Sequence, residues 1–261
     1  MQNNLAKNCV IYTCVIDNYD KTFPAVRATP GIDFILFSNT SVQVVGWKTI
    51  RIDSSRFESA TLANRYYKFF AHEVLDDYTY SMYIDGNIRV LTDLSYLFSL
   101  FSESGCTLGL LKHPYRKTLP EEIARCKELG VLDDNDAADC QLEDYKSQGF
   151  KDDLGLTENN VIFRNHSSDI LSTSMETWWN ELQMKTNRDQ LSLGYVRWKH
   201  NLSVLVFEWN ARQENPYLYL YPHTKGSILN EIKVSVKARR FDSLPHKVIY
   251  RLWQWLKKCK I

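Results

Sequence analysis

Short, almost continuously apolar segments alternate with segments of helical periodicity along most of this chain. Residues 8–16 form the first apolar run, residues 34–38 the second and residues 80–84 a third, while residues 60–75 carry apolar side chains at helical spacing. Strands that read as near-continuous apolar runs are typical of a sheet covered on both faces. The alternation therefore predicts an α/β fold with a mainly parallel central sheet.

The remaining elements follow from the same patterns. Further strands are expected at residues 47–52, 107–111, 161–163, 202–207 and 217–221, and helices at 94–101, 175–183 and within the acidic stretch 121–153. With 261 residues, of which 44% are hydrophobic, the chain can bury a large core. We expect residues 1–230 to form a single catalytic domain and residues 231–261 a basic tail.

One strand ends in a motif that suggests chemistry. The run Tyr80–Val90 is interrupted by Asp85, Gly86 and Asn87. In open α/β sheets ligands bind beyond the carboxyl ends of the strands, which is where this carboxylate would lie. Asp85 and Asn87 are oxygen ligands of the type that Mg²⁺ and Mn²⁺ prefer. A tight Asp-Gly turn that closes a hairpin is the alternative interpretation.

Composition narrows the class of protein. The six cysteines are scattered without a Cys-x-x-Cys pair, which argues against a zinc site and against a disulfide framework. No apolar run has the length of a membrane span, and the first residues lack the apolar core of a signal peptide. A cytosolic location is expected.

The charge of the C-terminal segment differs from that of the rest. Residues 232–261 contain nine Lys or Arg and one acidic residue, although the whole chain has a net charge of only +1. On a helical projection of residues 244–261, apolar side chains that include Trp253 and Trp255 fall on one arc and Lys or Arg opposite. Such a helix suits the surface of an anionic membrane. Docking on the domain by its apolar face is an equal alternative, and nucleic acid is disfavoured because the rest of the chain is acidic.

The order of several motifs resembles one known family. It resembles the glycosyltransferase-like family of bacterial capsule and plant mucilage proteins, from about Cys9 to about Tyr221. The most specific part pairs a Glu-x-x-x-Ile-x-Arg-x-His segment with Arg-Asp-Gln-Leu-Ser two dozen residues later. The segments that carry the resemblance are residues 64–68, 83–87, 112–116, 158–166, 178–181 and 188–192. The motif order is also similar to that of family 8 retaining glycosyltransferases.

This resemblance implies a fold, an activity and a cofactor. The fold is GT-A, a Rossmann-like sheet that binds a nucleotide sugar. Mn²⁺ or Mg²⁺ would be held by Asp85, Asn87 and the late His223, with Lys225 facing the phosphates. Asn87 stands where the usual motif has a second aspartate, so weak or absent metal dependence is an open alternative. His223 as an ordinary loop residue is another, because turn residues surround it.

The resemblance also implies roles for the remaining polar residues. Asp189 and Gln190 are the expected catalytic pair, with Gln190 beneath the sugar and Asp189 on its hydroxyls. Capping of the helix that begins at Gln190 is a second role that Asp189 could have. The donor nucleotide is expected against Tyr12, Thr13, Asp17, Asn39, Arg65 and Lys68. The donor or acceptor sugar is expected against Glu158, Asn159, Asn160 and Arg164, with His113, Arg116 and Glu181 as further candidates on the acceptor side.

The expected function is transfer of a sugar from a nucleotide sugar, with UDP as the nucleotide, to a glycan or lipid-linked acceptor. Retention of configuration and a place in capsule or lipopolysaccharide synthesis follow from the resemblance. A metal-dependent hydrolase is one alternative, although its metal site would need more histidines and carboxylates. A non-catalytic carbohydrate-binding or scaffold subunit is another. Asn87 favours the scaffold, whereas Arg65, Lys68, Asp189 and Gln190 together favour the enzyme.

Overall fold

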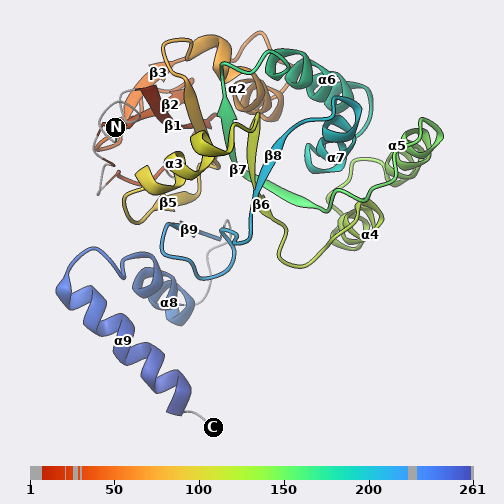
Figure 1. Cartoon of the computed structure of the whole chain (residues 1–261). Helices are drawn as coiled ribbons and strands as arrows, with labels where there is room; N and C mark the ends of the chain where they lie inside the picture. Colours follow the sequence, from red (N-terminus) through yellow and green to blue (C-terminus); the bar gives the residue numbers. More distant parts are fainter. Residues whose placement is uncertain (1–7, 21, 26–28, 30, 223–227, 260–261) are drawn as a thin grey trace.

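The protein is a layered α/β domain from which a helical hairpin projects (Figure 1). The computed structural model describes residues 8–20, 22–25, 29, 31–222 and 228–259. Within these residues, one sheet has seven strands in the order β3 (Lys48–Arg51), β2 (Asp33–Ser38), β1 (Cys9–Val15), β4 (Tyr80–Ile84), β7 (Thr157–Asn165), β6 (Leu108–Lys112) and β8 (Val204–Phe207). A second sheet pairs β5 (Ile88–Val90) with β9 (Leu218–Leu220).

The seven-stranded sheet is mainly parallel, as the sequence predicts. Strands β3, β2, β1 and β4 are parallel neighbours, and β6 and β8 are parallel to each other. Among the described strands of this sheet, β7 alone runs against its neighbours. The first residues of β7 therefore lie at the same edge of the sheet as the carboxyl ends of β1 and β4, which positions them for the site described below.

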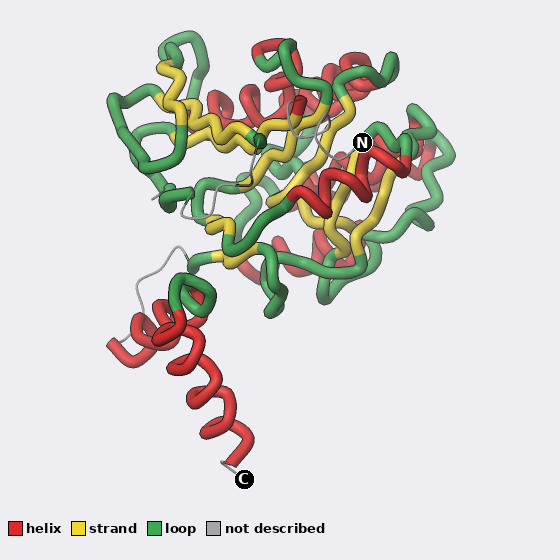
Figure 2. Tube along the Cα trace, turned by 60° about the vertical axis from the view of Figure 1, so that its left-hand side comes forward, coloured by secondary structure: helices red, strands yellow, loops and turns green. Residues whose placement is uncertain are grey.

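Both faces of the sheet are covered, which explains the continuous apolar runs. Val10, Tyr12 and Cys14 point to one hydrophobic cluster, and Cys9 and Ile11 point to another on the opposite face. The first cluster is covered by α2 (Ala60–Val74), α4 (Leu119–Leu129), α5 (Asn135–Ser147), α6 (Leu171–Met184) and α7 (Gln190–Lys199). The second is covered by α3 (Ser95–Ser104) and by β5 and β9. Figure 2 shows the helices on either side of the strands.

Helix α2 has a regular start and an irregular end. The Ser59 side chain accepts a hydrogen bond from the amide of Leu62, which caps the helix. Near the other end, Phe70 leaves helical geometry, with φ −105° and ψ 18°. This kink coincides with a buried arginine of β7 that binds the carbonyl of Lys68, as described below.

Two helices follow the sheet at the C-terminal end. These are α8 (Ile228–Ala238) and α9 (Leu244–Cys259), which pack against each other. Both lie beside the β5–β9 end of the domain, and α9 extends away from it (Figures 1 and 2). Across the described residues, none of the helices combines the length and apolar character that crossing a bilayer demands.

Candidate functional site

A cleft of about 650 Å³ opens at the carboxyl ends of β1 and β4. Strand β2 follows β1 in sequence but lies on its other side, so β1 and β4 flank a point where the strand order reverses. Open α/β sheets bind ligands at such points. The volume is within the range of ligand pockets, roughly 300 to 1,000 Å³. The walls come from the β1 end and the loop after it, from α2, from the β4 end, from the start of β7 and from the start of α7.

A buried ion cluster joins α2 to the start of α7 in this cleft. The Lys68 ammonium donates a hydrogen bond to the Asp189 carboxylate at 2.6 Å, and the Arg65 guanidinium lies 3.6 Å from the other oxygen of Asp189. The Lys68 side chain is only 2% exposed. Burial alone would raise the pKa of Asp189, but Arg65 and Lys68 hold it well below its usual value. Asp189 is therefore a permanent carboxylate that keeps two cations at the cleft.

Asp85 belongs to the same cluster. One oxygen of Asp85 lies 3.9 Å from the Lys68 ammonium and accepts a hydrogen bond from the Tyr83 hydroxyl at 2.9 Å. Burial, together with the neighbouring Asp85, raises the pKa of Tyr83 well above its ordinary value, so the phenol stays protonated and donates. The Asp85 side chain remains 34% exposed. Tyr83 and Lys68 thus fix Asp85 on the protein side, and its exposed part faces the cleft, where a ligand can reach it.

The loop after β1 brings two further side chains to the cleft. Asp17 and Asn18 adopt the left-handed conformation, with φ 53° and 55°, which is uncommon for residues other than glycine. Asn39, at the end of β2, holds this turn by accepting from the Asp17 amide at 2.9 Å and donating to its carboxylate at 2.7 Å. The turn directs Tyr19 and Asp20 along the cleft.

Gly86 allows Asp20 to approach the end of β4. A Cβ atom on Gly86 would lie 2.9 Å from Asp20 Cβ, 3.3 Å from an Asp20 carboxylate oxygen and 2.7 Å from Val15 Cγ2. Distances below 3.0 Å cannot be accommodated without movement. The missing side chain therefore keeps the Asp20 carboxylate beside the segment that carries Asp85.

The first residues of β7 form a buried polar wall. Glu158 is paired with the Arg212 guanidinium, and the Asn160 amide donates to Glu158 at 3.2 Å. Burial raises the pKa of Glu158, and Arg212 opposes this effect. Asn159 is 4% exposed, and neither its amide nitrogen nor its amide oxygen has a hydrogen-bond partner among the described residues. Buried amides without partners are costly, which marks Asn159 as a group that a ligand could satisfy.

One of the three expected metal ligands, Asn87, does not line the cleft. Asn87 is buried, is not part of the cleft wall, and its amide nitrogen donates to the Tyr221 carbonyl at 2.6 Å. The reason is that the Tyr221 amide also binds the Asn87 carbonyl, which joins Asn87 to the ribbon of β5 and β9. Asp85 and Asp20 both line the cleft and carry hard oxygen atoms, and Asp20 approaches Gly86, the residue that follows Asp85. In the described part of the chain, no group of three or more His, Cys, Asp or Glu side chains is arranged to hold a metal.

Several expected site residues are buried away from the cleft. Arg164 is fully buried, and its guanidinium donates to the Tyr12 hydroxyl at 2.8 Å and to the Lys68 carbonyl at 2.6 Å. Tyr12 donates to the same carbonyl at 3.1 Å. The side chain of Arg164 lies on the α2 face of β7, where the kink at Phe70 accompanies this bonding. Arg164 and Tyr12 thus position α2 and do not line the cleft.

Three other expected residues also lie outside the cleft wall. Glu181 is 7% exposed and accepts a hydrogen bond from the Tyr145 hydroxyl at 2.8 Å, because α6 turns this side chain toward α5. Thr13 is buried within β1. Asn39 acts through the turn that it holds. Glu181 and Asn39 therefore make contacts within the fold and Thr13 is enclosed in its strand, while the donor or acceptor contacts expected of these three residues stay predictions.

His113 and Arg116 form a compact group near the cleft. The His113 Nδ1 accepts from the backbone amides of Tyr115 and Arg116, and Arg116 is paired with the buried Glu122. Burial, with Arg116 close by, lowers the pKa of His113 to about 4. Neither His113 nor Arg116 lines the cleft itself. This group supports the loop after β6.

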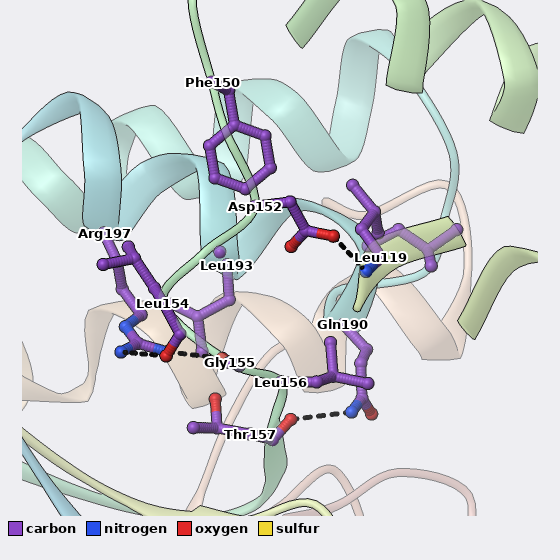
Figure 3. Close-up of a pocket in the computed structure, with 12 residues that line it drawn as sticks. Leu119, Phe150, Asp152, Leu154, Gly155, Leu156, Thr157, Gln190, Leu193 and Arg197 are labelled. Carbon is purple, nitrogen blue, oxygen red and sulfur yellow. Dashed lines mark hydrogen bonds between the residues drawn. The ribbon is translucent and has the colours of Figure 1, made fainter. Parts of the chain in front are cut away.

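Gln190 is fixed at the base of the cleft. Its amide nitrogen donates to the Thr157 carbonyl at 2.7 Å, as Figure 3 shows. The adjacent cavity in Figure 3, between Leu119, Phe150 and Gln190, has a volume of about 10 Å³, enough for a single water at most. Asp189 occupies the N-cap position of α7 but makes no side-chain capping hydrogen bond, because its carboxylate faces Lys68 and Arg65.

Two expected phosphate and metal contacts cannot be placed. His223 and Lys225 lie outside the residues that the structure describes.

Other residues of the cleft were not expected from the sequence. Asn64 had a weak signal, since it lies one residue before Arg65 in the same motif, and Arg188 directly precedes the expected catalytic pair. Tyr19, Asp20 and Arg212 lie in loops that reach the cleft, and no motif or regular spacing in the sequence marks them. The full set of unexpected polar or aromatic residues that line the cleft is Tyr19, Asp20, Thr61, Asn64, Tyr83, Arg188 and Arg212.

Comparison with known proteins identifies relatives. A family model described as "TOD1/MUCI70, glycosyltransferase-like domain" matches residues 3–218. A curated protein of Arabidopsis thaliana, "Probable hexosyltransferase MUCI70", is 26% identical over 201 residues, which are 74% of this chain and 33% of that protein. This chain thus spans about a third of the length of that relative.

The chain is also similar in structure to several solved glycosyltransferases. The bifunctional glycosyltransferase WbbM has a TM-score of 0.47 at 11% identity, with 77% of this chain and 39% of that chain covered. Mouse xyloside xylosyltransferase 1 has a TM-score of 0.45 at 12% identity, with 77% and 84% covered. The glycosyltransferase GlyE of Streptococcus pneumoniae has a TM-score of 0.44 at 13% identity, with 77% and 45% covered.

Proposed function

This chain belongs to the TOD1/MUCI70 glycosyltransferase-like domain family, and from this premise we propose that it transfers a sugar from a nucleotide sugar to a glycan or lipid-linked acceptor. The proposed donor is a UDP-sugar and the proposed acceptor belongs to capsule or lipopolysaccharide synthesis at the cytoplasmic side of a membrane.

One observation carries the proposal. The Lys68 ammonium lies 2.6 Å from Asp189 and 3.9 Å from Asp85, so it links the end of β4 to the start of α7 within one cleft. These two carboxylates are about a hundred residues apart in sequence. A single ligand of nucleotide-sugar size can therefore contact both.

The charges of the cleft suit the departure of a diphosphate. As the bond between the anomeric carbon and the phosphate oxygen breaks, negative charge develops on the phosphate and positive charge on the sugar. Arg65, Lys68 and Arg188 supply cations toward the phosphates. Lys68 is deeply buried, and burial lowers its pKa, but Asp189 opposes this effect and holds the ammonium in place. Charge stabilisation of this preorganised kind is worth most in a site that excludes water.

The sugar itself would lie against β7 and the start of α7. Asn159 and Asn160 offer amide groups for hydroxyls, and Glu158 is fixed beside them by Arg212. The amide oxygen of Gln190 faces the sugar in this proposal, since its nitrogen is held by Thr157. A carboxylate or amide beneath the anomeric carbon stabilises the positive charge that develops there.

We assign retention of configuration to this arrangement. The acceptor oxygen attacks the anomeric carbon from the side that the phosphate leaves, a new C–O bond forms, and the acceptor proton passes to the departing phosphate oxygen. This route needs no separate protein base. It fits a cleft in which Asp189 is paired with Arg65 and Lys68, and Glu158 is paired with Arg212.

A divalent cation, Mn²⁺ or Mg²⁺, fits the described oxygen donors only in part. Asp85 and Asp20 would hold it, and when bound it would neutralise charge on the diphosphate. Because Asn87 is held by Tyr221, the contribution of the metal is expected to be modest.

The test is release of UDP from a panel of UDP-sugars, measured with the wild-type chain and with Gln190→Ala. Steady UDP release from one donor, reduced at least about tenfold in Gln190→Ala without loss of UDP binding, supports the transferase. UDP binding without release of UDP from any donor, with or without acceptor glycans, would favour the scaffold. Absence of nucleotide binding would contradict the proposal.

A further inference from the structure

The hairpin formed by α8 and α9 is attached to the domain through polar contacts. Arg89 of β5 donates to the Ala238 carbonyl at 2.8 Å and pairs with Asp242 at 2.8 Å. Arg240 donates to the Asn215 carbonyl in the loop before β9. These buried arginines fix the turn between the two helices to the small sheet of β5 and β9.

One side of α9 faces the domain. The Tyr250 hydroxyl contacts the Glu214 carboxylate, and the Gln254 amide donates to the same carboxylate at 3.1 Å. His246 and Trp253 share this side of the helix and are partly covered. The Lys237 ammonium of α8 lies 5.5 Å from the Trp253 ring centre. The side of α9 that touches its own protein is therefore largely polar and aromatic.

The apolar side of α9 points away from the domain. At 3.6 residues per turn, Leu252 and Leu256 project opposite to Tyr250 and Gln254. Trp255 is 62% exposed and Leu256 55% exposed. The exposed apolar residues of the two helices are Ile228, Leu229, Ile232, Leu244, Val248, Ile249, Leu252, Trp255 and Leu256. Docking of α9 on its own domain by the apolar face, one of the two alternatives that the sequence leaves open, is thus not what the structure contains.

Basic side chains border this apolar surface. Lys247 and Arg251 are exposed on one side of it and Lys257 on the other. Residues 232–261 carry nine Lys or Arg and one acidic residue. Helices that lie in a membrane interface combine an apolar face with a basic polar face, since apolar burial and attraction to anionic lipids then add.

We propose that the exposed apolar face of α9, defined by Leu244, Val248, Ile249, Leu252, Trp255 and Leu256, docks on an anionic lipid bilayer. Two copies of the hairpin would bring like charges together, which disfavours a second copy of this chain as the occupant. The docking leaves the contacts of Arg89, Arg240 and Tyr250 with the domain unchanged, because these lie on the other side. The inference concerns binding alone and does not depend on the sugar transfer.

Flotation of the full chain with vesicles tests this proposal. The vesicles contain phosphatidylcholine with or without phosphatidylglycerol. We expect flotation with phosphatidylglycerol and loss of flotation in high salt. The partition constant of Leu256→Glu should be at least about tenfold lower, because burying one leucine side chain changes such an equilibrium constant by about this much or more. Val45→Glu, which places the same charge on a loop residue that is 78% exposed, leaves flotation unchanged.

Three results would overturn the proposal. The first is failure of the wild-type chain to float with phosphatidylglycerol. The second is equal flotation of the wild type and Leu256→Glu. The third is a wild-type dimer in sedimentation that Leu256→Glu converts to a monomer without any flotation, which would make a second copy the occupant. Calorimetry with UDP on the same samples reports the cleft separately, so failure of docking and failure of the transferase proposal remain distinguishable.

Discussion

The Lys68 ammonium donates a 2.6 Å hydrogen bond to the Asp189 carboxylate across 121 residues of sequence. Both groups are almost completely buried, and each has a second charged neighbour in the cleft, Asp85 for Lys68 and Arg65 for Asp189. Buried charges that lose a partner are strongly destabilising. Removal of either side chain is therefore expected to lower the stability of the domain and to change the charges that face a ligand in the cleft.

Coupling between these two residues can be measured with a double-mutant cycle. We expect Lys68→Met to lower the free energy of unfolding by about 3 kcal/mol and Asp189→Asn by a similar amount, since each leaves a buried charge behind. Lys68→Met combined with Asp189→Asn should cost at least about 1 kcal/mol less than the sum of the two. Urea unfolding of the four proteins gives the three differences. Strict additivity would show that the two side chains do not interact.

Gly86 provides a second test, in which a substitution fills space beside the cleft and leaves the charges unchanged. Gly86→Ala places a methyl group against Val15 and Asp20, and we expect weaker UDP binding by about tenfold and a loss of roughly 1 to 3 kcal/mol in stability. Gly194→Ala is the control, since its new Cβ meets only Phe150 at 3.5 Å inside α7. That substitution should be neutral or stabilising. Equal UDP affinity in both variants would remove the assigned role of Gly86.

Asn159 is expected to trade stability against function. Its amide is buried without hydrogen-bond partners in the described structure, so Asn159→Leu should leave the melting temperature unchanged or raise it. Sugar transfer, measured as UDP release from the preferred donor, should fall at least about tenfold. A variant that melts well below the wild type would instead make Asn159 a structural residue.

Acid should destabilise the fold through three histidines, of which His72 and His113 are buried and His166 is partly buried. Burial lowers the pKa of His72, His113 and His166 to about 4, with the guanidinium of Arg164 or Arg116 nearby. In the unfolded chain the same rings take up protons near pH 6.5. Stability is therefore full above about pH 6.5 and falls as the pH is lowered toward about 4, where the folded rings also protonate.

Melting temperatures recorded between pH 7 and pH 4 check this dependence. His166→Gln should reduce the slope, because it removes one of the three groups whose proton uptake differs between the folded and unfolded chains. An unchanged slope in His166→Gln would assign the acid sensitivity to other groups.

Much of the fold follows from local patterns. The apolar runs of β1, β2 and β4 and the helical periodicity of α2 are visible because packing on two faces requires them. The direction of β7 is not visible, since a strand of either direction has the same apolar pattern. The strand predicted from the sequence, residues 161–163, is shorter than β7. Its first residues were missed because Glu158, Asn159 and Asn160 are polar, although all three are buried.

The site is predictable only in part. Asp85, Arg65, Lys68 and Asp189 lie in recognisable motifs, and the structure brings them into one cleft. Asp20 reaches the cleft through a left-handed turn and a glycine 66 residues later in sequence, a contact that no local pattern encodes. Arg164 lies in one of the recognisable motifs, but it is buried under α2 and positions that helix. This burial could not be predicted from the motif, because it depends on how the helix packs on the strand.

Calorimetric titration of UDP into the wild-type chain and into Asp85→Asn, each with and without Mn²⁺, tests the central claim most directly. We predict that UDP binds to the wild type, that Mn²⁺ strengthens this binding, and that Asp85→Asn abolishes the gain from the metal while the fold remains intact. The absence of UDP binding to the folded wild-type chain in either condition would contradict a nucleotide-sugar site in this cleft.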